Sequence, residues 1–235
     1  MPWPSVLETG SALGELFPRH GFPLVSTTAH RDLGELAPAD RAGLEQACAK
    51  RRGEFAAGRH CLRLALAALG VTEAPLPPDE QGAPRWPSGT VGSISHTRGM
   101  VVAVAARRNT ASGLGVDVDD ISRPFPRRIL PQVLRDEEQA ELDRLPAAQR
   151  DLHAYASFCA KESVYKCVCT ATGIRLRFTD VSLSLDLDRG TFVASFHRSV
   201  PPGWPPVLTG RVGRSREHVY SGLWWPPAAA PKESS

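Results

Sequence analysis

The sequence predicts an α+β protein built from two halves, each of which runs from a helix to a β-hairpin. Apolar residues recur at helical spacing in two long stretches, 38–70 and 153–173. Each stretch is followed by an alternating segment folded about a turn, at 90–108 and at 180–199. The repeated order of elements indicates an internal duplication, although the two halves share no visible residue repeat.

In the first half, residues 38–70 predict one or two helices, with Asp40 as a possible N-cap and an end at Gly70. A proline-rich connector follows at 74–84. The segment 90–108 then predicts two strands around a Thr-Arg-Gly turn, because β-branched residues lie on both sides of that turn. The polar, glycine-containing stretch 106–113 is the expected joint between the halves.

The second half begins with apolar spacing typical of a helix at 129–145. The longer helix of 153–173 ends at Gly173, which is a favoured residue just beyond a helix. Alternation on both sides of Asp188-Arg189-Gly190 predicts the hairpin of 180–199. The tail 226–235 is rich in Pro, Ala and Ser and is expected to be disordered.

Composition indicates a globular protein without a dominant charge. The chain has 235 residues and 42% apolar content, enough for a packed core in one large or two small domains. Its 28 basic and 25 acidic residues give a net charge of +3. So small an excess does not by itself indicate a nucleic-acid-binding protein, and an anion site must come from local clustering.

The five cysteines indicate a reducing compartment. They are odd in number, lack C-x-x-C spacing and lie in apolar helical runs, so neither a disulfide framework nor a zinc site is predicted. The first ten residues do not resemble a signal peptide, and no apolar stretch reaches the length of a membrane span. We therefore expect a cytoplasmic protein.

An acidic strand end provides the first candidate site. In GVDVDD (115–120), Asp117 and Asp119 alternate with Val116 and Val118, so both carboxylates share one face while the valines point to the core. Paired carboxylates suit a hard cation such as Mg²⁺, which completes its shell with water and phosphate oxygens. The alternative is a polar strand edge that enters a turn.

The helix around 158–166 carries the second candidate. Glu162 and Lys166 are i,i+4 neighbours next to Lys161, an arrangement that a solvated helix also uses for about 0.2–0.5 kcal/mol of stabilisation. The surrounding residues are apolar and aromatic. The charges are therefore expected at the rim of a buried element.

Basic residues on the first helix form a third candidate, an anion site. Its members are Lys50, Arg51, Arg52, Arg59, His60 and Arg63. Helical spacing places Arg52 and Arg59 on one face, and guanidinium groups bind phosphate bidentately. A solvated helix face is the alternative. Ser95, His96 and Arg98 at the first hairpin turn also provide donors for an anion.

Four segments together resemble the Sfp/EntD-type 4'-phosphopantetheinyl transferases: RRGEFAAGRHCLRLAL (51–66), GSISHTRG (92–99), LGVDVDD (114–120) and FCAKESVYK (158–166). The resemblance spans roughly residues 35–225. It implies an enzyme that moves the 4'-phosphopantetheine arm of coenzyme A to a serine of an apo acyl or peptidyl carrier protein. Adenosine 3',5'-bisphosphate is released, and Mg²⁺, with Mn²⁺ as a substitute, is required.

The resemblance also implies roles for matched residues. Asp117, Asp119 and Glu162 would hold the metal, with Lys166 and Lys161 neutralising phosphate charge; Asp117, Glu162 and Lys166 would form the catalytic set. Arg51 and Arg59 would bind the 3'-phosphate end, where the family pattern favours Arg51 over Arg52, and Ser95 and His96 would line the nucleotide site. Many relatives have Glu in place of Asp119, so that residue could contact metal through water. The proton acceptor is Glu162 or a metal-bound water.

The implied architecture has two similar subdomains about a pseudo-twofold axis, each a long helix packed on a small antiparallel sheet, with coenzyme A in the cleft between them. The expected boundaries are 1–108, 109–225 and the tail 226–235. The protein is expected to be a monomer without nucleic-acid or membrane partners. Whether the carrier belongs to fatty-acid, polyketide, nonribosomal-peptide or siderophore synthesis stays open.

A basic segment before the helix of 129–145 is a candidate for carrier docking. It carries Arg123, Arg127 and Arg128, and carrier proteins in this family are usually acidic. An ordinary loop is the alternative. Two other functions also stay open on these residues: a Mg²⁺-dependent phosphohydrolase that uses the same carboxylates, and a non-catalytic module that binds anions or nucleic acid through the arginine helix.

Overall fold

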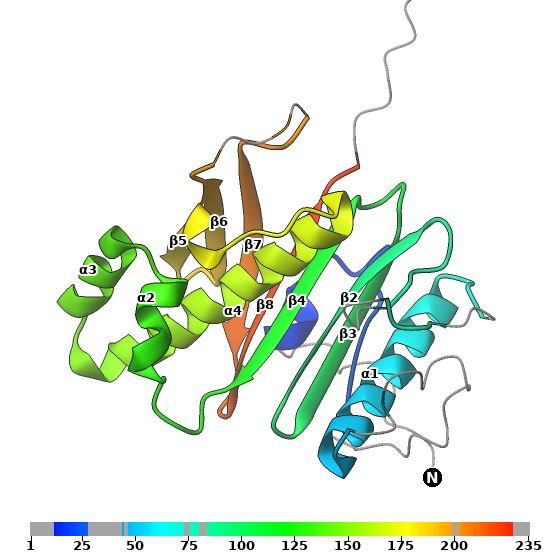
Figure 1. The fold of residues 1–235 in the computed structure, drawn as a ribbon, viewed down its shortest axis with the longest axis horizontal. Coiled ribbons are helices and arrows are strands. Elements are labelled where there is room, and N and C mark those ends of the chain that lie inside the picture. Colours follow the sequence, from blue (N-terminus) through cyan, green and yellow to red (C-terminus); the bar gives the residue numbers. More distant parts are fainter. Residues whose placement is uncertain are drawn as a thin grey trace, which may run out of the picture.

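The computed structural model describes residues 12–27, 44, 47–72, 76–79, 84–198, 201 and 203–227. The predicted cap at Asp40, part of the proline-rich connector and the tail beyond residue 227 lie outside these residues. The described chain forms two antiparallel sheets, each covered by one long helix, which confirms the predicted α+β class (Figure 1). Within these described parts, no helix is long and apolar enough to cross a membrane.

The first sheet has three strands in the order β1 (Leu24–Thr27), β3 (Met100–Arg107) and β2 (Thr90–Thr97). The predicted hairpin is confirmed as β2 and β3, which pair antiparallel around the Gly99 turn. Helix α1 (Ala49–Ala68) covers one face of this sheet, and its Cys61 and Leu62 pack with Ala103 of β3. Both faces of β3 are buried, which explains its nearly continuous apolar run.

The second sheet has five strands in the order β4 (Gly113–Asp120), β8 (His218–Trp225), β7 (Val207–Arg214), β6 (Thr191–Phe196) and β5 (Val181–Asp186). The predicted second hairpin is confirmed as β5 and β6. Helix α4 (Ala147–Thr172) crosses this sheet and ends at Gly173, whose φ of 72° provides the left-handed cap (Figure 1).

The predicted helices differ in extent from those observed: α1 begins at Ala49, since residues 44, 47 and 48 are not helical, and α4 begins at Ala147 rather than at 153. The segment predicted as a single helix at 129–145 is instead η4 (Arg127–Ile129), α2 (Leu130–Val133) and α3 (Asp136–Arg144). Leu134 and Arg135 have extended backbone angles, so the helix stops between them. The carboxylate of Glu138 accepts the Arg135 N–H at 2.8 Å, and this capping bond starts a new helix.

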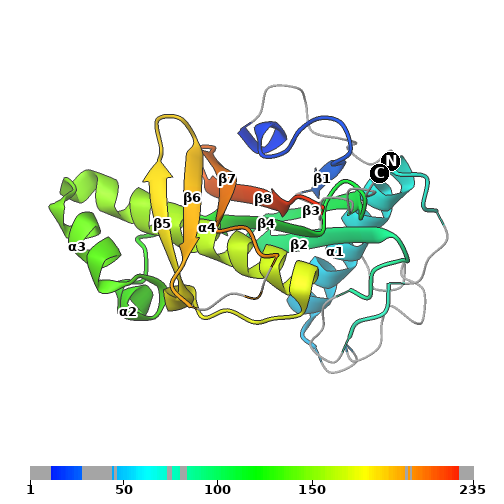
Figure 2. The same ribbon diagram turned by 90° about the horizontal axis from the view of Figure 1, so that it is seen from above.

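The two sheets meet edge to edge along β2 and β4, which lie side by side in both ribbon views (Figures 1 and 2). Helices α1 and α4 lie on one side of the strands, and η1 (Ala12–Glu15) lies on the other (Figure 2). On the η1 side, Leu16 belongs to one apolar cluster with Val104 of β3 and with Val116 and Val118 of β4. This continuous core spans the seam and fixes the position of each sheet relative to the other.

Candidate functional site

The acidic strand end lies where α4 crosses β4. Gly113, Gly115, Asp117 and Asp119 alternate along β4 and so share its helix-facing side. A Cβ at Gly115 would stand 1.8 Å from the carbonyl oxygen of Ser163, so only glycine permits this approach of the helix. The glycines bring α4 against the strand, and the aspartates that follow face the charged residues of that helix.

Asp117 is the best-connected member of this group and is only 5% exposed. Its Oδ1 accepts one hydrogen bond from Lys166 Nζ and another from Ser95 Oγ, each 2.6 Å long. Lys166 Nζ also donates to the carbonyl of Val116 at 3.2 Å. Strand β4, helix α4 and strand β2 therefore converge on a single carboxylate.

Glu162 is close enough to Lys166, Asp117 and Asp119 for their charges to change its pKa. Burial raises the pKa of Glu162, Lys166 opposes that rise, and Asp117 and Asp119 add to it. Burial also raises the pKa of Asp119, with a further rise from Asp117. Burial alone would lower the pKa of Lys166, but the Asp117 and Glu162 carboxylates outweigh it and the net shift is upward. Three carboxylates thus repel one another around one ammonium group.

The donor set suits a divalent cation, although it is not arranged as a complete cage. Among the described residues no group of three acidic, histidine or cysteine side chains is close enough to hold an ion alone. Mg²⁺ typically takes only one or two protein carboxylates and obtains its other ligands from water and substrate phosphates. Two strand carboxylates opposite Glu162 fit that partial donor set.

A cavity of about 650 Å³ adjoins the carboxylates on the side of α1. Arg51 and Arg59 line it from α1, His96 from β2, Lys166 from α4 and Arg175 from beyond the end of α4. Arg51 lies on this cavity and Arg52 is not among its lining residues, so the helical-wheel preference for Arg52 is not met. Four cationic side chains around one cavity suit an anionic ligand with several phosphates.

His96 stands at this cavity between charges of both signs. Its Nε2 lies 2.9 Å from a guanidinium nitrogen of Arg51 and 3.4 Å from a carboxylate oxygen of Glu54. Burial lowers the pKa of His96, Glu54 opposes that shift, and Arg51 adds to it. A guanidinium group can only donate, so Nε2 is the acceptor of a neutral ring.

Two predicted site residues are placed elsewhere. Lys161 is 2% exposed and points away from Lys166, because five helical residues turn the side chain by about 140°. Its Nζ donates to Glu138 at 2.6 Å and to the carbonyls of Phe178 and Val181 at 3.2 and 2.9 Å. The predicted phosphate contact of Lys161 is therefore corrected to a buried structural ion pair. Ser95 is not among the residues lining the large cavity; it donates to Asp117 instead.

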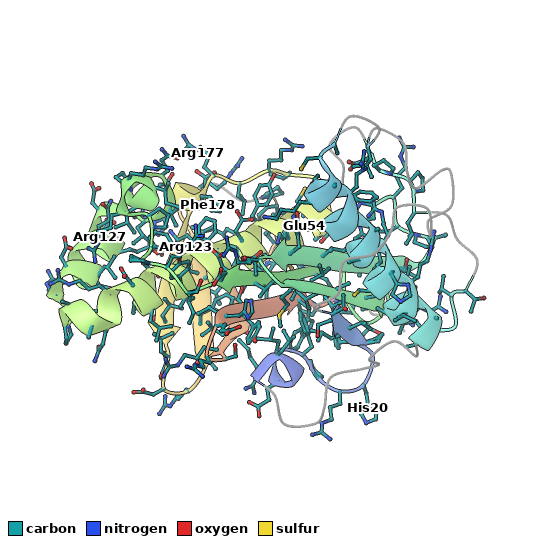
Figure 3. The ribbon with its side chains drawn as sticks, turned by 90° about the horizontal axis from the view of Figure 1, so that it is seen from below. His20, Glu54, Arg123, Arg127, Arg177 and Phe178 are labelled. Atoms are coloured by element: carbon teal, nitrogen blue, oxygen red, sulfur yellow. The ribbon has the colours of Figure 1, made fainter. Side chains whose placement is uncertain are left out.

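A second cavity, of about 470 Å³, opens beside Glu162. Pro131 and Gln132 of α2 line it together with Tyr165 of α4 and Phe178 of η5 (Phe178–Asp180). Figure 3 shows Arg123, Arg127, Arg177 and Phe178 toward the helical end of the second sheet, away from Glu54 on α1. Glu162 thus borders a space next to the predicted docking segment.

Sequence reasoning missed Tyr165 and Arg175. Tyr165 lines both cavities, and Arg175 lines the larger one. Tyr165 lies inside the segment 158–166, where an aromatic residue among apolar ones is typical of a buried helix face. Arg175 follows the helix cap at Gly173, and only the folded chain places it near α1.

Comparisons with known proteins point to one family. Residues 39–106 match the family model for the 4'-phosphopantetheinyl transferase N-terminal domain, and residues 113–205 match that for the 4'-phosphopantetheinyl transferase superfamily. The chain is 40% identical over 190 residues to 4'-phosphopantetheinyl transferase Svp of Streptomyces mobaraensis, covering 80% of this chain and 73% of that one. It is 36% identical over 157 residues to PptT of Mycobacterium tuberculosis, covering 65% and 66%. Enterobactin synthase component D of Salmonella typhi is 33% identical over 123 residues, covering 52% and 50%.

Proposed function

This chain belongs to the 4'-phosphopantetheinyl transferase superfamily, and on that basis we propose how its residues carry out the transfer. The protein is an enzyme that transfers 4'-phosphopantetheine from coenzyme A to apo carrier proteins. The observation that carries the proposal is the convergence of Asp117, Glu162 and Lys166 beside a cavity lined by cationic groups.

The larger cavity is the proposed coenzyme site. Arg51, Arg59 and His96 would bind the 3'-phosphate end of the nucleotide, and Lys166 would meet the diphosphate at the acidic strand end. A guanidinium group suits phosphate because its planar fork donates two parallel hydrogen bonds. Arg175 adds a further positive charge to the same cavity. The nucleotide would therefore lie between α1 and α4, with its diphosphate nearest Asp117.

The chemical step is the attack of a carrier serine hydroxyl on the β-phosphorus. A new P–O bond forms, the bond from phosphorus to the bridging oxygen breaks, and adenosine 3',5'-bisphosphate leaves. We propose Glu162 as the acceptor of the serine proton, because it borders the smaller cavity, where the carrier serine would approach. Lys166 would stabilise negative charge that develops on the phosphate oxygens.

Asp117, Asp119 and Glu162 are the proposed metal-holding residues. A divalent ion held there would supply positive charge to the diphosphate and thereby stabilise the transition state. Mg²⁺ is the proposed ion, since the donors are all carboxylate oxygens. Lys166 donates a hydrogen bond to Asp117 in this structure. When coenzyme A binds, its diphosphate would compete with Asp117 for this ammonium group.

We place the carrier on the side of the smaller cavity. Arg123, Arg127 and Arg128 lie in the segment that leads into α2, and α2 lines this cavity together with Glu162. A carrier bound to these arginines would present its serine to Glu162. The likeness to enterobactin synthase component D favours a carrier that belongs to a synthase of that kind. A monomer in the cytoplasm is also proposed, the latter supported by five free cysteines.

The test is intact-mass measurement of apo carrier proteins incubated with the enzyme, coenzyme A and Mg²⁺. The expected result is addition of one phosphopantetheine arm to a carrier, lost when its serine is replaced by alanine. Phosphate release from coenzyme A in the absence of carrier would instead identify a phosphohydrolase. Salt-sensitive nucleic-acid binding without any transfer would identify a binding module. Neither alternative gains support from the matched relatives.

A further inference from the structure

The seam between the two sheets is a ladder of hydroxyl groups. Ser93, Ser95 and Thr97 alternate along β2 and accept the backbone N–H groups of Val116, Val118 and Asp120 at 3.1, 3.4 and 3.2 Å. Each bond joins residues 23 positions apart, so β2 and β4 run in the same direction in a fixed register. Side chains thus satisfy an edge of β4 that another strand would otherwise satisfy.

Two of these hydroxyls have a second role. Ser95 Oγ donates to Asp117 Oδ1 at 2.6 Å, and Thr97 Oγ1 donates to Asp119 Oδ1 at 3.3 Å. A hydroxyl can donate one hydrogen bond while it accepts another, so each of these residues holds a strand amide and a carboxylate together. Ser93 accepts its amide in the same way but is not bonded to either aspartate.

We propose that Ser95 is a positioning residue for the metal-holding carboxylate, with Thr97 acting more weakly on Asp119. This inference rests on the proposed function. Ser95 is 5% exposed, and its short bond fixes which way the Asp117 carboxylate turns. Lys166 donates to the same oxygen but must also serve the diphosphate. Ser95 therefore keeps Asp117 oriented when Lys166 turns to the substrate.

Ser95 would act as the hydrogen-bond partners of metal ligands act in other proteins. Hydrogen bonds to a ligating carboxylate orient it, and their loss typically weakens metal binding about 10- to 100-fold. Ser95 comes from the first sheet, whereas Asp117 belongs to the second. The register of the seam thereby determines the geometry of the metal site, and the first sheet contributes to both coenzyme and metal binding.

The experiment measures Mn²⁺ dissociation constants by electron paramagnetic resonance in the presence of coenzyme A and without carrier. Ser95→Ala is compared with Ser93→Ala, which loses a seam hydrogen bond but no bond to a carboxylate. Both variants are expected to lower the melting temperature, and Ser95→Ala should lower it more because it also loses the bond to Asp117. Only Ser95→Ala should raise the Mn²⁺ dissociation constant, by about tenfold or more. Ser93 also lines the coenzyme cavity, so the constants are compared at saturating coenzyme A.

Rescue provides the second readout. Ser95→Thr keeps the hydroxyl and should restore Mn²⁺ binding to within about threefold of wild type. Raising Mg²⁺ should restore kcat for Ser95→Ala, and Thr97→Val should show a smaller change in the metal constant. Ser95→Cys, with its weaker donor, replaces Ser95→Ala if that variant does not fold, and an intermediate constant is then expected.

Equal Mn²⁺ constants for Ser95→Ala and Ser93→Ala, or a wild type that binds no Mn²⁺, would overturn the inference. If either result is found while intact-mass measurement still shows transfer of the phosphopantetheine arm by the wild type, the assignment as a transferase stands. Loss of arm transfer by the wild type itself would contradict the proposed function instead.

Discussion

Asp117 shows how one residue acquires its environment from three elements. Its neighbours in sequence place it on the helix-facing side of β4, but its hydrogen bonds come from Lys166 of α4 and Ser95 of β2. Both donors reach the same oxygen of this buried carboxylate. The two bonds hold the carboxylate in one orientation, which is the orientation that we propose for cation binding.

Lys161 provides a stability prediction at the residue scale. Lys161→Met should lower the free energy of unfolding by about 3–5 kcal/mol, because Glu138 would be left as a buried charge without its partner. Urea denaturation measures this loss, and the KM for coenzyme A should stay within about twofold of wild type. The double variant Lys161→Met/Glu138→Gln should recover part of the stability. A large rise in that KM without loss of stability would return Lys161 to the phosphate site.

His96 provides a pH prediction. Its pKa is lowered in the folded protein, mainly by burial, so below about pH 6.5 the unfolded chain takes up the proton first. The contribution of His96 to the free energy of unfolding is therefore lost as the pH falls below about 6.5. The free energy of unfolding of wild type minus that of His96→Gln should decrease between pH 7 and pH 5. The exposed His20 gives the control His20→Gln, and equal slopes for wild type and His96→Gln would refute the prediction (Figure 3).

At the scale of elements, the close contact between β4 and α4 brings Glu162 and Lys166 of the helix near the aspartates of the strand. The glycines at 113 and 115 permit the contact, and Thr170 Oγ1 of α4 adds a hydrogen bond to the Leu114 carbonyl at 3.2 Å. Glu162 and Lys166 lie on the turns of α4 next to this contact. The distance between strand and helix thus sets the distance between the carboxylates.

Gly115→Ala should separate these elements. Its new methyl group would meet the Ser163 carbonyl, which is backbone and cannot turn aside, so we expect a loss of at least about 1–3 kcal/mol in unfolding free energy. Turnover should fall further than stability explains, because Glu162 and Lys166 move with the helix. Gly58→Ala is the control for stability: its nearest neighbour is a side-chain methyl group of Ile94 at 3.2 Å. Wild-type stability in Gly115→Ala would show that the contact is not tight.

At the scale of the whole molecule, the seam creates two approaches to one reaction centre. The cavity proposed for the coenzyme lies on the α1 side of Lys166, and the smaller cavity lies on the α2 side of Glu162. Two substrates can thus reach the carboxylates from different directions. We keep the proposed boundary near residue 108, which falls between β3 and β4.

Charge reversal at Arg127 and Arg128 tests the carrier approach. Replacing both with Glu should raise the KM for an acidic carrier several-fold while the KM for coenzyme A is unchanged, because rim charges act mainly on association. Added salt should reduce the difference between variant and wild type. Arg189→Glu, in the β5–β6 turn, provides an exposed control. An unchanged carrier KM would remove this segment from the docking surface.

The sequence by itself determined the local features of this protein. Alternation in GVDVDD placed Asp117 and Asp119 on one face, and the two hairpins and the cap at Gly173 follow from turn and helix signals that act over a few residues. It did not reveal β1, which has only four residues, nor β7 and β8, whose internal glycine and polar residues leave pairing to the neighbouring strands. Nor did it reveal the break at Leu134, where the hydrogen bond from the Arg135 N–H to the Glu138 carboxylate outweighs a continuous apolar spacing.

Only the tertiary structure decided which charged groups share the site. Lys161 and Lys166 look alike in the sequence, yet one is paired with Glu138 and the other with Asp117, since helix rotation and packing determine which neighbours each one meets. Ser95 looked like a ligand contact but reaches a carboxylate across the seam. Contacts between residues 20 to 120 positions apart depend on how whole sheets pack, and short-range patterns carry no record of that packing.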